Sequence, residues 1–100
     1  MPPADGVSML QEMVDLFLTG VPQRLAQITQ ALNDPAKLAF HAHALKSMSL
    51  NLGATHIIDL SQKLEETARA GNLHDAPALL KELEAAFTQT KDQLVSLRNQ

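Results

Sequence analysis

The stretch DPAKLAFHAHALKSMSLNLGA, residues 34–54, decides the fold because it contains signals for both ends of one long helix. Asp34 is a good N-cap residue, and Pro35 suits the first helical turn, where its missing N–H is not needed. Gly53 can end the helix in a left-handed conformation. Small and apolar residues recur between these ends at helical spacing, at Leu38, Ala42, Leu45, Ser49 and Leu52. The stretch predicts a helix over residues 35–52.

Four more helical segments are predicted around this one, bounded by glycine, proline or capping residues. They cover about residues 7–19, 22–32, 55–70 and 76–97. Gly20 ends the first segment, and Pro22 fits the first turn of the second. Gly71 follows the fourth segment, and Asp75 caps the last.

Connections of two to five residues make successive helices antiparallel neighbours. We therefore predict an all-α fold: an antiparallel up-down-up-down four-helix bundle built from the last four segments. The short additional N-terminal helix, residues 7–19, would lie across one end. Residues 1–6, MPPADG, are expected to be a disordered lead or a linker remnant, with the domain over residues 7–100.

Composition excludes several classes of protein. A chain of 100 residues with 45% hydrophobic and only 3% aromatic residues suits one domain of packed helices rather than a β-sandwich. A net charge of −3, without a basic cluster, argues against contact with nucleic acid or an anionic membrane. The absence of cysteine removes disulfides and thiolate sites, and no apolar run of 18 residues exists. We expect a cytoplasmic domain.

Two histidines stand two positions apart in the predicted helix, at His41 and His43. Residues with this spacing point in roughly opposite directions, so the pair cannot hold one metal ion. No glutamate precedes a histidine by three positions, as helical-bundle metal sites require, so no metal site is expected. His41 is expected to face solvent without a role.

His43 lies on the flank of the apolar seam, where its ring can reach solvent. A neutral imidazole is a good nucleophile near pH 7 and can carry a labile phosphoryl group. Lys46 places a cation one turn away, and Ser47 is small enough to admit a partner. An idle surface histidine remains the alternative, because such chemistry also needs an acceptor for the second ring nitrogen on a neighbouring helix.

The segment HALKSMSLNLGA, residues 43–54, resembles the signature of histidine phosphotransfer (Hpt) domains, roughly H-x-L-K-G-[SA]-x-x-x-L-G-[AV]. The resemblance extends over nearly the full chain, through LSQKLEETARAGNL and the long final helix. It implies a helical bundle that relays phosphoryl groups in multistep two-component phosphorelays.

The resemblance implies a role for each residue that matches the signature. His43 would accept phosphate from a receiver-domain aspartate, and Lys46 would neutralise the phosphoryl oxygens. Gly53 would turn the chain between the two central helices. Glu65 matches the position that accepts a hydrogen bond from the histidine ring, with Gln62 as the fallback.

Three further features bear on partner contact. Arg69 matches a position that is often basic and could contact a partner or the phosphate. Ser47 departs from the family's usual glycine, but it is small and transfer is expected to survive. Apolar residues of the first helix are expected to form a patch on which a receiver docks; they are Leu10, Met13 and Phe17.

The resemblance implies response-regulator receiver domains or a hybrid sensor histidine kinase as partners. The receiver would bring Mg²⁺ and the acceptor aspartate, so this domain is expected to need no cofactor and to act as a monomeric phosphocarrier. It lacks an ATP site, so we do not expect a true enzyme. The chain could stand alone or form the C-terminal domain of a membrane-anchored hybrid kinase.

Two other functions compete with this interpretation. One is the phosphoacceptor bundle of a histidine kinase, in degenerate form. There an acidic residue usually follows the histidine and a proline stands five positions after it, whereas this chain has Ala44 and Met48. The other is a non-catalytic helical adaptor, which would give no reason for His43, Lys46 and Gly53 to occur together.

Overall fold

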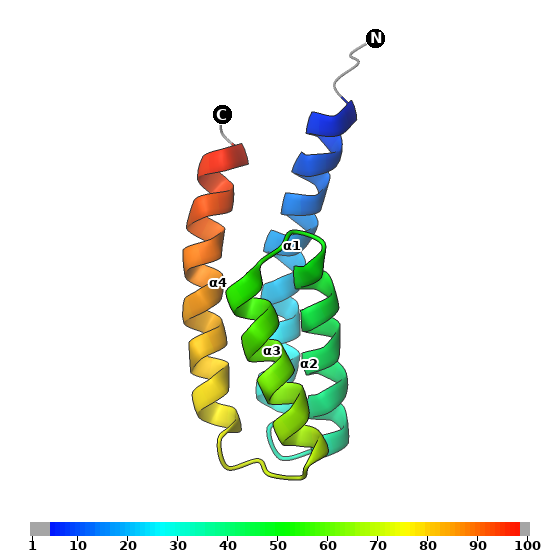
Figure 1. Cartoon of the computed structure of the whole chain (residues 1–100), viewed down its shortest axis with the longest axis vertical. Helices are drawn as coiled ribbons and strands as arrows, with labels where there is room; N and C mark the ends of the chain where they lie inside the picture. The colour runs from blue at the N-terminus through cyan, green and yellow to red at the C-terminus, as the bar shows by residue number, and fades with distance from the viewer. Residues whose placement is uncertain (1–4, 99–100) are drawn as a thin grey trace.

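The computed structural model describes residues 5–98 and shows a bundle of four helices (Figure 1). They are α1 (Asp5–Gln30), α2 (Pro35–Leu50), α3 (Thr55–Arg69) and α4 (Ala76–Arg98). Successive helices run antiparallel, and α4 returns to pack on α1. No strand occurs within the described range. The predicted all-α, up-down-up-down four-helix bundle is confirmed.

The expected additional N-terminal helix is wrong, because residues 7–19 are the first half of α1 rather than a separate element. Gly20 and Pro22 both lie inside this 26-residue helix. Their local cost, about 1 kcal/mol for glycine and about 3 for proline, is offset by burial of one continuous apolar face. That face comprises Val14, Phe17, Val21, Leu25 and Ile28.

Gly20 has a second reason to lie in the middle of α1. A Cβ atom at this position would lie 2.6 Å from the Cε of Met48 on α2, so the missing side chain leaves space for that methionine.

The domain boundary stays a prediction: α1 begins at Asp5, and residues 1–4 of the expected lead lie outside the described residues.

The ends of α2 follow the sequence signals closely. The Asp34 side chain accepts a hydrogen bond from the Lys37 backbone N–H at 3.2 Å, and Pro35 occupies the first turn. The helix ends at Leu50, two residues before the predicted position, and Gly53 takes a φ of +65°. This tight turn returns the chain as α3 directly beside α2.

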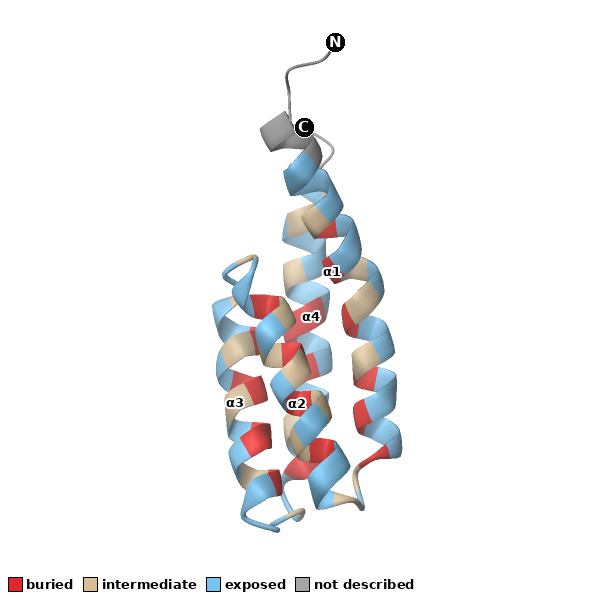
Figure 2. Ribbon diagram, turned by 90° about the vertical axis from the view of Figure 1, so that its right-hand side faces the viewer, coloured by how far each residue is buried: buried red, intermediate tan, exposed pale blue. Residues whose placement is uncertain are grey.

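Each helix contributes a buried stripe to one core, as Figure 2 shows. On α2 the stripe is Leu38, Ala42, Leu45 and Ser49, four of the five positions predicted. On α3 it includes Ile57, Leu60, Leu64 and Ala68. The most extensive contact in the bundle joins α2 to α3, so side chains on their flanks meet across a close interface. None of the described helices is long and apolar enough to span a membrane.

Candidate functional site

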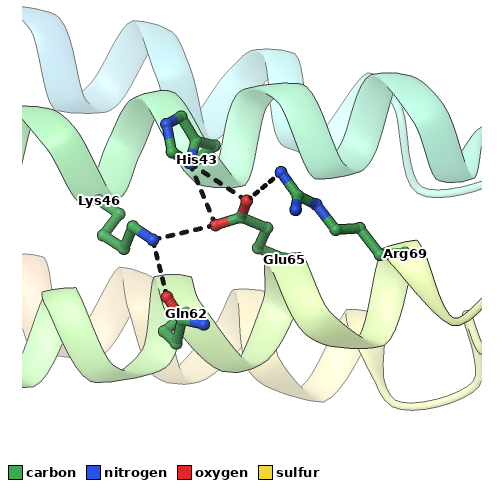
Figure 3. A network of polar contacts seen from close by, with 5 residues as sticks. All are labelled: His43, Lys46, Gln62, Glu65 and Arg69. Atoms are coloured by element: carbon green, nitrogen blue, oxygen red, sulfur yellow. Dashed lines mark hydrogen bonds and ion pairs between the residues drawn. The ribbon is translucent and has the colours of Figure 1, made fainter.

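His43 lies on the outer flank of α2, where its side chain is 54% exposed. Its Nδ1 atom faces the Glu65 carboxylate of α3, at 3.1 Å from Oε2 and 3.3 Å from Oε1 (Figure 3). The antiparallel packing of α2 against α3 creates this contact between residues 22 positions apart. The second ring nitrogen, Nε2, lies on the side of the imidazole away from this contact.

Glu65 is the centre of the site and is only 4% exposed. Besides His43 it contacts two cations: Lys46 Nζ lies 3.3 Å from Oε1, and Arg69 Nη2 lies 2.6 Å from Oε2. Burial opposes ionisation of the carboxyl, but hydrogen bonds from His43 and Lys46 and the charges of Lys46 and Arg69 outweigh it. The pKa of Glu65 therefore lies below its ordinary value.

An ionised Glu65 fixes the state of the neutral imidazole. A carboxylate can only accept hydrogen bonds, so Nδ1 of His43 carries the proton and donates it. The neutral ring then has its lone pair at Nε2. One buried carboxylate faces two cations, Lys46 and Arg69, so the site has a surplus of one positive charge. This surplus of positive charge favours an anionic group in the vicinity of His43.

Gln62 was the alternative candidate for the hydrogen bond to the His43 ring, but it has a different partner. Its Oε1 atom instead accepts a hydrogen bond of 2.7 Å from Lys46 Nζ. The structure therefore brings together His43, Lys46, Gln62, Glu65 and Arg69, all five drawn in Figure 3, and places Glu65 rather than Gln62 on the imidazole.

The outer face of α2 carries two exposed apolar residues on either side of His43. Phe40 is 66% exposed and Leu50 is 58% exposed, and Ser47 is exposed between His43 and Leu50. The apolar docking patch expected on the first helix did not include Phe40 or Leu50. The available signal was their spacing of three and seven positions from His43, which places them on its face of the helix.

The structure corrects the docking expectation for Phe17. This side chain is 3% exposed, and its ring packs against that of Phe87 with centroids 5.8 Å apart. It lies in the core because α1 is continuous and turns this face inward. Leu10 is exposed and Met13 is half-buried, so these two residues do reach the surface of α1.

His41 also differs from expectation, because it is half-buried rather than solvent-facing. Its Nδ1 atom lies 2.8 Å from Nη1 of Arg24 on α1 and accepts from that guanidinium. Burial, together with the charges of Arg24 and Lys37, lowers the pKa of His41. The two histidines thus contact opposite neighbours, α1 and α3. No group of three or more potential metal ligands occurs among the described residues.

The site thus combines an exposed imidazole with a buried carboxylate on the flank of a four-helix bundle. The family model described as Hpt domain matches residues 12–93, most of the chain, and the chain belongs to this family. Hpt domains take part in phosphotransfer in two-component systems, where they interact with receiver domains and kinases. No curated protein and no solved structure matched the chain.

Proposed function

We propose that His43 is the phosphoacceptor of a multistep phosphorelay. The observation that carries this proposal is the contact of Nδ1 with the buried Glu65, which leaves an exposed imidazole with its lone pair at Nε2. That lone pair forms the N–P bond while the P–O bond to a receiver aspartate breaks and its electron pair stays on the aspartate. The Nδ1 proton remains with the ring, and the reverse step hands the phosphoryl group to a second receiver.

The charges of the site support this chemistry. Phosphoryl transfer depends mainly on positioning and on neutralising the phosphoryl oxygens. Lys46 lies one turn from His43 and would face those oxygens. Arg69, which also contacts Glu65, would add a second positive charge to the site. Glu65 would stabilise the positive charge that the ring acquires as the N–P bond forms. The domain would need no cofactor, since the receiver would supply Mg²⁺ and the aspartate.

The apolar residues Phe40 and Leu50 support docking of a receiver over His43. They expose hydrocarbon on both sides of the imidazole, and such surface is typical of protein contacts. Ser47 adds only a hydroxymethyl group between His43 and Leu50, which leaves the approach open. Leu10 and Met13 would extend the docking surface onto α1. One chain supplies all four helices, which favours a monomeric carrier over the dimeric bundle of a kinase.

The proposal is tested by incubating the domain with ³²P-labelled receivers and asking whether label moves to it. We expect an alkali-stable, acid-labile label on the wild-type protein and none on His43→Gln. His41→Gln is the matched control, because it changes a histidine of the same helix and should keep the label. Label on His43→Gln, or no label with any receiver tried, would contradict the proposal and favour a helical adaptor.

A further inference from the structure

Gln62 makes the shorter of the two hydrogen bonds that hold Lys46. The Lys46 ammonium lies 2.7 Å from Gln62 Oε1 and 3.3 Å from Glu65 Oε1, and both acceptors project from α3 (Figure 3). We propose that Gln62 is a positioning residue, which holds the Lys46 ammonium beside His43 so that it can meet a phosphoryl group on Nε2. This inference rests on the proposed function.

The number of hydrogen-bond donors on lysine supports this role. An ammonium has three N–H donors, and Gln62 and Glu65 engage two of them. In the part of the chain that the structure describes, no third acceptor contacts Lys46 Nζ. One donor is therefore left for a phosphoryl oxygen, while two acceptors one turn apart on α3 restrain an otherwise flexible four-carbon chain.

The neutrality of the Gln62 amide also fits this role. Glu65 already neutralises one of the two nearby cations, and a second carboxylate would cancel the remaining positive charge. An amide oxygen restrains the ammonium and leaves that charge available to a phosphoryl group. Gln62 is half-buried and belongs to the same helix as Glu65, so both acceptors reach Lys46 from one element.

The test uses phosphoramidate, a small donor that needs no receiver. The Nε2 lone pair of His43 attacks phosphorus, the donor's P–N bond breaks, and its electron pair leaves on ammonia. Phosphohistidine formation is followed by ³¹P NMR in the wild type, Gln62→Met, Lys46→Met and the double variant. Gln89→Met, an exposed glutamine on α4, is the matched control.

We expect Gln62→Met to slow phosphorylation about three- to tenfold, the range that one hydrogen bond supports. In the Lys46→Met background the same change should have no further effect, because a positioning residue acts only through the group it positions. The Gln89→Met protein should match the wild type. An unchanged rate in Gln62→Met, or an equal slowing in both backgrounds, would overturn the inference.

A second measurement needs no variant. The Lys46 ammonium protons should exchange with water more slowly than those of Lys63, an exposed lysine on α3. Equal exchange in ¹⁵N-selective NMR would overturn the inference. Failure of the proposed function would look different: the labelled domain would form phosphohistidine from phosphoramidate but pass nothing to receivers.

Discussion

Replacing Glu65 with glutamine removes one charge from the centre of the site and keeps the side-chain volume. The hydrogen bonds from His43 and Lys46 are of the charged kind, worth about 1.5–3 kcal/mol each, and the substituted amide oxygen can still accept one of them. Arg69 is 67% exposed, so its ion pair adds at most about 1 kcal/mol. We expect Glu65→Gln to lower the free energy of unfolding by about 1–2 kcal/mol at pH 7, or the Tm by about 5–15 °C.

The difference in unfolding free energy between the wild type and Glu65→Gln should shrink as the pH falls. The pKa of Glu65 is lowered in the folded state. The stability that its carboxylate adds to the fold is therefore complete at pH values above the ordinary pKa of a glutamic acid. That stabilisation is lost as the pH falls through the lowered folded pKa. Urea unfolding of both proteins from pH 7 downward should therefore show curves that converge in acid. A constant difference down to pH 2 would refute the assignment of an ionised carboxylate to this site.

The same variant should slow phosphorylation of His43 about 10- to 100-fold, as the loss of an orienting carboxylate does at other histidines. The physical cause is the loss of the group that fixes the Nδ1 proton and stabilises the charged ring. The ¹⁵N shifts of His43 should show the proton on Nδ1 in the wild type and a mixture of tautomers in Glu65→Gln. Unchanged tautomers together with an unchanged rate would show that Glu65 does not orient the His43 ring.

Three more predictions address the fold and His41. Leu45→Ala opens a cavity at a fully buried position and should cost about 2–5 kcal/mol in urea unfolding, whereas a cost below 1 kcal/mol would contradict its place in the core. Pro22→Ala should raise the Tm, because it restores a hydrogen bond within a continuous α1, and a lower Tm would favour two separate helices. Arg24→Gln removes one of the causes that lower the pKa of His41, so NMR titration should show that pKa move up. The His41 contribution to stability is present above the ordinary histidine range and lost as pH falls through the lowered pKa, so a wild-type stability that rises on acidification to pH 5 would contradict it.

The sequence predicted the elements whose ends have specific local chemistry. The ends of α2 are set by Asp34, Pro35 and Gly53, as expected. A cap, a fixed φ and a left-handed turn each act within a few residues of their own position. Gly20 and Pro22 gave equally local signals, and there the prediction failed. Burial of one apolar face along the whole of α1 outweighs them, and that gain depends on helices far away in the sequence.

For the site, too, local spacing predicted only the contacts within one helix. Helix geometry alone separated His41 from His43 and placed Lys46 near the latter. The pairing of His43 with Glu65 came from the family resemblance, since the register of α2 against α3 cannot be read from spacing. The contact between Gln62 and Lys46 depends on side-chain rotamers and appeared only in the structure.

The proposed phosphoryl transfer takes place at one atom, Nε2 of His43. After transfer from a phosphorylated receiver, mass spectrometry and ³¹P–¹H NMR can locate the phosphoryl group in the domain. We expect a single phosphorylated residue, His43, with phosphorus bonded to Nε2 and the proton kept on Nδ1. Phosphorus on Nδ1, or on any residue other than His43, would contradict it.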